Sequence, residues 1–283
     1  MQTKLKLTAL AGAVALALGA GQASAAIIPA SEGNSEMVLS VWDVARNTSY
    51  TLDLGFFQST LTPTGVSTQS GIISNSTPLV MSFAADALLT QFLADSAANN
   101  SLGSVLWNVV GGDSTGTTLN SRKTLVTAQS SVTEALIEGL ATAQMNNMLG
   151  AFNGYVSQVN TVGNHQSVTN GNNIEVLGDG LGNDFAYAGG AGWGTAFGGN
   201  ANFNNAGALG EGLNFWSLSS GSSSSAKISA TQFFGASAPA IWTLASNGTL
   251  TFAAVPEAET WALLGLGLLG AGAVARRRSR ALA

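Results

Sequence analysis

The stretch MVLSVWDVARNTSYTLDL, residues 37–54, carries the clearest structural pattern in this sequence. Side chains alternate in character along residues 37–42 and again along residues 50–54, a period of two that is typical of β-strands. The polar run RNT at residues 46–48 lies between these segments and is typical of a turn. The stretch therefore predicts a β-hairpin, whose two strands pair antiparallel.

Outward from this hairpin, the pattern predicts mixed structure with more strand than helix. Short apolar runs predict strands at residues 105–110, 124–127, 215–218, 226–234, 241–244 and 249–252. Turns are expected at residues 111–116 and 219–225, and Asn247-Gly248 predicts a second hairpin. Helical spacing predicts amphipathic helices at 83–95 and 131–153, the second with Ser131 and Glu134 as a capping box. The expected fold class is α+β and β-rich, a single domain of antiparallel strands with two amphipathic helices.

Composition narrows the functions available to the chain. Its 283 residues are 46% hydrophobic and 9% charged, which is the reverse of a disordered composition. The absence of Cys excludes a disulfide framework, a thiolate zinc site and a Cys nucleophile. Residues 26–254 contain four basic and thirteen acidic residues, a net charge of −9, so nucleic acid is not an expected partner.

The N-terminal residues 1–25 predict a secretory signal peptide. Lys4 and Lys6 precede an uncharged run at residues 8–20, which is too short for a stable membrane anchor of ~20 residues. The small residues Ala23, Ser24 and Ala25 suit signal peptidase, with the cut before Ala26; a cut after Ala26 is also allowed. The extracytoplasmic body is then expected to span residues 26–254.

The C-terminal residues 255–280 combine three features. The motif VPEAET at residues 255–260 is followed by an apolar run at residues 261–275 and by the cluster Arg276, Arg277, Arg278 and Arg280. As a helix the run would be roughly 22 Å long, short of a ~30 Å hydrocarbon core. The arginines favour the cytoplasmic side and Trp261 suits the opposite interface, so transient insertion in the inner membrane would leave the body outside. An ordinary single-pass tail anchor is the alternative.

This three-part tail resembles the PEP-CTERM sorting domain of Gram-negative bacteria. Val255, Pro256, Glu257 and Thr260 match its motif, whereas Ala258 replaces the second proline. The resemblance implies recognition by an exosortase, a membrane transpeptidase similar to cysteine proteases, and removal of the tail near the motif. It also implies delivery to the cell surface or to an exopolysaccharide matrix.

Catalytic residues are not expected in the body. Residues 112–116, GDSTG, superficially resemble the segment around a serine-protease nucleophile, but Ser114 would need a positioned base. His165 is the single histidine, and its neighbours resemble no triad segment. Glu134 and Glu138 are spaced as exposed neighbours on a helix. A polar turn and a solvated helix face account for these residues.

One segment offers candidate metal ligands. Residues 178–184, GDGLGND, resemble one turn of the Gly- and Asp-rich calcium repeats, in which Asp179 and Asp184 would supply hard oxygen ligands. Those sites form between stacked repeats, and this sequence contains one such turn, so a Gly-rich surface loop is the alternative. The position of Glu175 relative to these carboxylates cannot be inferred from sequence. No cofactor is expected.

The sequence favours a non-enzymatic, exosortase-sorted protein of the cell surface or extracellular matrix, associated with exopolysaccharide or biofilm. Signal peptidase and exosortase are the expected processing partners. Two alternatives remain open: a secreted hydrolase that acts on matrix polysaccharide through a pair of carboxylates, and a calcium-dependent adhesion module.

Overall fold

A single antiparallel sheet organises the fold. The computed structural model describes residues 26–61, 80–116, 121–190, 192–234 and 239–254. Its strands are β1 Glu36–Asp43, β2 Thr48–Phe57, β3 Met81–Phe83, β4 Val105–Asp113, β5 Lys123–Ala128, β6 Asn172–Val176, β7 Gly207–Ala208, β8 Gly212–Ser219, β9 Ser229–Gln232, β10 Ala240–Leu244 and β11 Leu250–Ala254. Their order is β3-β11-β10-β8-β5-β4-β1-β2-β6, with β7 on β4 and β9 on β8. The pairings among these strands are antiparallel, so the β-rich class predicted from sequence is confirmed.

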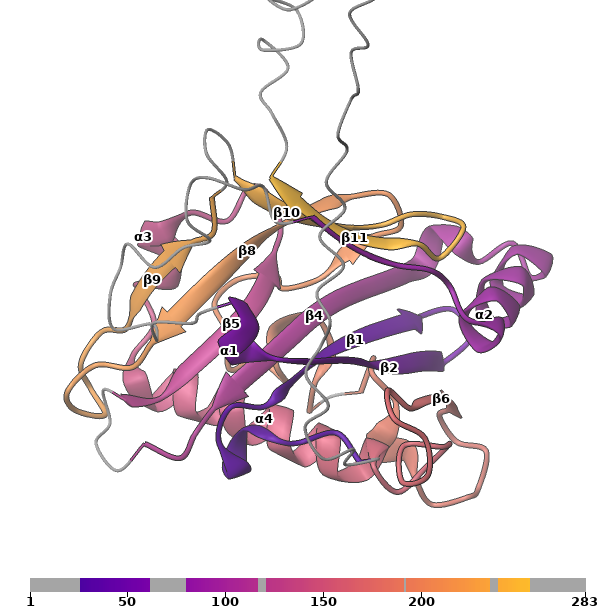
Figure 1. The fold of residues 1–283 in the computed structure, drawn as a ribbon, viewed down its shortest axis with the longest axis horizontal. Helices are drawn as coiled ribbons and strands as arrows, with labels where there is room; N and C mark the ends of the chain where they lie inside the picture. The colour runs from indigo at the N-terminus through magenta and orange to yellow at the C-terminus, as the bar shows by residue number, and fades with distance from the viewer. Residues whose placement is uncertain (1–25, 62–79, 117–120, 191, 235–238, 255–283) are drawn as a thin grey trace, which may run out of the picture.

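The sheet is curled into a half-barrel (Figure 1). Strand β3 forms one edge, and β2 lies next to the other edge strand, β6. Despite their distance in the strand order, Phe56 of β2 and Phe83 of β3 stack with ring centroids 5.9 Å apart. Phe83 also stacks on Trp242 of β10, at 6.3 Å. The curl therefore closes around aromatic side chains on its inner face.

Two hydrophobic clusters lie on opposite faces of the sheet, and β1 contributes to both. Val38 and Trp42 belong to one cluster, whereas Met37, Leu39 and Val41 belong to the other. Alternate side chains of a strand point to opposite faces, so both faces of β1 are covered. The whole strand is buried, as expected where two layers pack on a central strand.

Two helices of three or more turns cover these faces. Helix α4, Thr142–Val159, places Met148, Phe152 and Val156 in the cluster that contains Trp42. Helix α2, Ala87–Ala98, packs Leu89, Phe92 and Leu93 against the cluster inside the curl. The shorter helical segments are η1 Ala30–Glu32, α1 Gln58–Leu61, η2 Leu102–Ser104, α3 Glu134–Ile137, η4 Asp184–Ala186 and η5 Gly194–Ala196.

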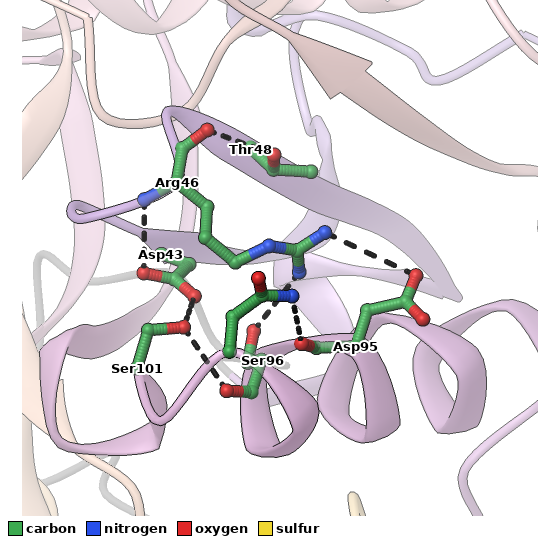
Figure 2. Close-up of polar contacts among 7 residues, drawn as sticks. Asp43, Arg46, Thr48, Asp95, Ser96 and Ser101 are labelled. Atoms are coloured by element: carbon green, nitrogen blue, oxygen red, sulfur yellow. Dashed lines mark hydrogen bonds and ion pairs between the residues drawn. The ribbon is translucent and has the colours of Figure 1, made fainter.

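The predicted hairpin at residues 37–54 is confirmed as β1 and β2, and a buried carboxylate organises its turn (Figure 2). Asp43 accepts hydrogen bonds from the backbone amides of Ala45 (3.0 Å) and Arg46 (3.3 Å). It also accepts hydrogen bonds from the hydroxyls of Ser101 and Ser104. Burial alone would raise the pKa of Asp43, but these hydrogen bonds, led by that of Ser101, hold it below its usual value.

The same turn reaches the last part of α2. Arg46 Nη1 donates to Ser96 Oγ (3.3 Å), and Nη2 lies 3.9 Å from Asp95 Oδ2 (Figure 2). The turn between β1 and β2 is thus fixed to a helix about 50 residues later in the chain. Val44 and Asn47 of the same turn line the pocket described below.

The helix predicted at residues 131–153 is wrong as one element. The chain forms α3 at Glu134–Ile137, breaks, and starts α4 at Thr142. Ser131 does not form the predicted capping box, because the side chain of Thr133 caps α3 by accepting from the amide of Leu136. At the break, the amides of Thr142 and its neighbour donate to backbone carbonyls of residues 226 and 224. Partners distant in sequence therefore start a new helix.

Three other predicted boundaries are corrected. Residues 111–113 continue β4 instead of turning. The helix predicted at 83–95 begins at Ala87, because Asp86 caps it by accepting from the amide of Leu89. The strand predicted at 226–234 is the shorter β9. The hairpin predicted at Asn247-Gly248 is confirmed as β10 and β11, with Gly248 at a φ of 82°.

Candidate functional site

A glycine-rich loop after β6 builds the candidate site. Gly178, Gly180 and Gly182 have φ values of 80°, 82° and 79°, in the left-handed region that favours glycine. The backbone amide of Gly178 donates to Asp184 Oδ1 (2.7 Å), and that of Leu181 donates to Asp179 Oδ1 (2.8 Å). The loop thereby folds back on itself and brings two carboxylates that are five residues apart to one place.

A third carboxylate comes from the edge strand β6. Ligand oxygens of Glu175, Asp179 and Asp184 all lie within 4.8 Å of one another. Asp179 and Asp184 are exposed, whereas Glu175 is 3% exposed. These residues are called the acidic trio below. The sequence identified Asp179 and Asp184 but not Glu175, because neither the pairing of β6 with β2 nor the fold of the loop is visible in the local pattern.

The buried member of the trio has an unusual environment. Glu175 Oε2 accepts from Asn183 Nδ2 (2.6 Å), while Glu175 Oε1 is buried and has no hydrogen-bond partner within the described residues. Burial, followed by the charges of Asp179 and Asp184, raises the pKa of Glu175 to about 7. The hydrogen bonds from Asn183 and from the Val176 amide, the latter of which lowers the pKa, only partly offset the cost of burying this charge.

An open pocket adjoins the acidic trio. Its volume is about 740 Å³, and its wall is mainly apolar. It is lined by Val44, Asn47, Ala151, Gly154, Tyr155, Gln158, Leu177, Asp184, Phe185, Tyr187, Gly189, Gly190, Gly192 and Trp193. The rings of Tyr155 and Trp193 stack with centroids 4.7 Å apart and planes 7° apart. Asp184 belongs to both the trio and the pocket, so the two features are continuous.

The rim of the pocket carries exposed apolar side chains. Phe185 is 80% exposed, and Leu177 and Val44 are also exposed. Leu181, in the loop of the acidic trio, is 78% exposed. Single exposed apolar residues are common, but several around one hollow are typical of a binding surface.

Among the described residues, Ser114, His165 and Glu138 do not form a catalytic triad. His165 is buried, with Nε2 3.0 Å from Asn173 Oδ1, and burial lowers its pKa. The hydroxyl of Ser114 accepts a hydrogen bond from Asn153 Nδ2 (3.4 Å) and not from His165. Glu138 accepts from the amide of Ala230 (3.2 Å) and does not face the pocket lining.

A pair of buried carboxyl groups was not anticipated from sequence. Glu36 of β1 accepts from the amide of Ile28 (2.8 Å), and Asp53 of β2 accepts from that of Gly55 (2.8 Å). Burial, followed by the charge of Asp53, raises the pKa of Glu36 to about 7. Burial also raises the pKa of Asp53 to about 6. Neither group lines the pocket.

These shifts predict a maximum of stability in mild acid. Glu36, Asp53 and Glu175 are more easily protonated in the fold than in the unfolded chain, so their contribution to the free energy of unfolding falls as pH rises from about 4.5 to 7. The lowered pKa of His165 acts in the opposite direction, but it is one group against three. Asp43 has a lowered pKa, and so does Asp86, which accepts a hydrogen bond from Tyr50. Their contribution to the free energy of unfolding is therefore lost below a pH of about 4. Urea denaturation between pH 3 and 8 should therefore give a maximum near pH 4–5.

The control is a double variant, Glu36→Gln with Asp53→Asn, which removes both titrations and keeps an oxygen to accept each amide hydrogen bond. It should reduce the decline between pH 5 and 7 to the part that Glu175 contributes. A free energy of unfolding that rises over that interval in the unmodified protein would contradict the assignment.

Comparison with known proteins locates one motif. Residues 254–278 match the PEP-CTERM protein-sorting motif. The chain carries an exosortase sorting tail. The match covers the predicted residues Val255, Pro256, Glu257 and Thr260, and also Trp261 and Arg276–Arg278, so the resemblance drawn from the sequence is confirmed. The PEP-CTERM motif implies an exported protein that an exosortase processes.

Other comparisons give no relative for the body. No curated protein and no solved structure matches the chain. The predicted signal peptide, with Ala23 and Ala25, and the PEP-CTERM tail lie outside the described residues. Within those residues, no helix has the length and apolar character that crossing a bilayer requires.

Proposed function

We propose that this chain is a non-enzymatic protein of the cell surface or extracellular matrix that binds exopolysaccharide. The PEP-CTERM motif carries the proposal, because it directs the chain to exosortase processing and hence out of the cytoplasm. Signal peptidase removes residues 1–25, and exosortase releases or re-attaches the body near Val255. The body then acts in the hydrated matrix of a biofilm.

The pocket supports a role in carbohydrate binding. Sugar rings combine apolar C–H faces with hydroxyl groups, so they suit a surface with both aromatic and polar side chains. Phe185, Leu177 and Val44 supply apolar surface, and Asn47, Gln158 and Asp184 supply hydrogen-bonding groups in the same lining. A mainly apolar hollow with a few polar groups is the usual form of a small-ligand site.

The lining also favours binding over hydrolysis. Glycoside hydrolysis commonly uses two carboxyl groups that face one another across the substrate, ~5–10 Å apart. Among the described residues that line the pocket, Asp184 is the one acidic side chain. The hydrolase alternative would need a second carboxyl group on the opposite wall.

The Phe185→Ala variant tests the pocket. Removing an 80%-exposed ring leaves the core unchanged but removes apolar contact with the sugar, so binding should weaken roughly fivefold to tenfold, about 1–1.5 kcal/mol. Binding of the exported protein to exopolysaccharide purified from the producing cells is measured by co-sedimentation. The matched control is Phe234→Ala, which removes another exposed ring (43%) that does not line the pocket.

Equal weakening by both substitutions would move polysaccharide binding away from the pocket. The same incubation is assayed for new reducing ends. Their steady release by the unmodified protein would favour the hydrolase alternative and contradict a non-enzymatic role.

A further inference from the structure

We propose that Glu175, Asp179 and Asp184 form a calcium site at the rim of the pocket. The three carboxylates come from β6 and from two points of the following loop, and their ligand oxygens lie within 4.8 Å of one another. Carboxylates at this separation repel one another when they are ionised. In the described part of the chain the ion pair is that of Arg46 with Asp95, so no basic side chain there is paired with the trio.

A buried oxygen of Glu175 points to a missing positive partner. Glu175 is 3% exposed, and its Oε1 has no hydrogen-bond donor within the described residues. Asn183 donates from Nδ2 to the other oxygen of Glu175, and its own Oδ1 is likewise buried and unpartnered there. Buried acceptors without a partner are uncommon in folded proteins, and a cation bound by the trio would satisfy Oε1 of Glu175.

The remaining ligands are held by the loop backbone. In both Asp179 and Asp184, one carboxylate oxygen accepts a hydrogen bond from a backbone amide. This bond fixes the carboxylate and leaves its second oxygen available. The trio thus offers three side-chain oxygens. Water or sugar hydroxyls would complete the six to eight ligands that calcium takes.

Oxygen ligands on an irregular loop suit calcium better than magnesium, because calcium accepts flexible geometry. Two oxygens on one ion are separated by no more than twice the metal–oxygen distance, about 4.6–5.2 Å for calcium and about 4.0–4.2 Å for magnesium. The oxygens of the trio lie within 4.8 Å of one another, close enough for one calcium ion to bind all three after a small side-chain adjustment. Magnesium would need near-octahedral geometry at shorter metal–oxygen distances.

The calcium site also bears on polysaccharide binding, and this role of the ion rests on the proposed function. Asp184 lines the pocket as well as the trio, so an ion held there lies at the pocket edge. Its open coordination positions would bind sugar hydroxyl groups beside Phe185. Calcium would then strengthen polysaccharide binding as well as the fold.

The first experiment measures metal binding alone, on the exported protein after treatment with chelator. Calorimetric titration with CaCl₂ should give one site per chain, with a Kd of about 10⁻⁴–10⁻³ M as in extracellular calcium modules. At calcium 100-fold above Kd, the melting temperature should rise by about 5–10 °C. MgCl₂ should give a clearly smaller shift. Absence of heat and of any shift in the unmodified protein, or an equal response to magnesium, would overturn the proposal.

Variants locate the site. Asp179→Asn and Asp184→Asn change exposed carboxylates and should each weaken calcium binding at least tenfold, and Glu175→Gln should abolish it. Glu134→Gln, at an exposed carboxylate on α3, is the matched control and should bind calcium as the unmodified protein does. The exposed-site variants keep the test decisive if Glu175→Gln does not fold. Undiminished binding in both would place the ion elsewhere.

A further measurement tests the calcium site and polysaccharide binding independently of each other. Co-sedimentation with exopolysaccharide is repeated with CaCl₂ and with chelator. Calcium binding without any polysaccharide binding would contradict the proposed function and keep the metal site. Polysaccharide binding that is unaffected by chelator would contradict the bridging role of calcium.

Discussion

Replacing Trp242 by alanine is expected to lower the free energy of unfolding by about 3–5 kcal/mol. Trp242 is 0% exposed and lies inside the curl of the sheet. Its ring contacts those of Phe83, Phe215 and Phe252, from three other strands. Its removal would leave a cavity where the two ends of the sheet approach each other. Urea denaturation at pH 5 measures the change.

Two controls separate cavity formation from other effects. Trp242→Phe keeps a ring, and no described group bonds the indole Nε1, so the loss should be much smaller than for alanine. Phe57→Ala removes an aromatic ring that is 36% exposed and should cost about 1 kcal/mol or less. A loss below about 1 kcal/mol for Trp242→Ala would contradict a curl that closes around these rings.

The hairpin at residues 37–54 could be predicted because its information is local. Alternation along each strand and polar residues between them specify antiparallel pairing without reference to the rest of the chain. Burial of both faces of β1 was not predictable, because it depends on α2 and α4, which cover opposite faces of the sheet.

The prediction of one long helix at residues 131–153 was wrong because of tertiary contacts. Apolar spacing continues through residues 131–153, but Ala141 forms a β-bridge with Lys227, and the Lys227 ammonium donates to the carbonyl of Gly139. These contacts with a segment nearly 90 residues later interrupt the helix. Local propensity is a weak preference that such contacts override.

The glycines of β4 were predicted as part of a turn, whereas they belong to the strand. A Cβ on Gly111 would lie 2.4 Å from Met37 Sδ, and one on Gly112 would lie 2.5 Å from Leu149 Cδ2. These glycines allow core side chains to pack closely on both faces of the strand. Sequence alone gives the same residues the character of a turn.

The candidate site was predictable in part. Alternating glycine and acidic residues identified Asp179 and Asp184, because the motif is contiguous. Glu175 and the aromatic pocket required the fold, since the pocket combines the β1–β2 turn, α4 and the 177–193 segment. The sorting tail was fully predictable, because its recognition depends on a linear pattern.

Deletion of residues 255–283 is expected to redirect the exported protein almost completely. The PEP-CTERM motif is what an exosortase recognises, so without it the body should stay among soluble periplasmic proteins instead of reaching the surface or the medium. Immunodetection in cell fractions measures the distribution. The control is Phe234→Ala, which changes the body, keeps the tail and should be distributed as the unmodified protein is. An unchanged location after deletion would contradict sorting by the tail.

The most direct test of export and exosortase processing is the intact mass of molecules isolated from outside the producing cells. Signal-peptide and exosortase cleavage predict a chain that begins at or next to Ala26 and ends near Val255, without the arginine cluster at residues 276–280. Extracellular molecules whose mass still includes Arg-Ala-Leu-Ala at residues 280–283 would contradict it.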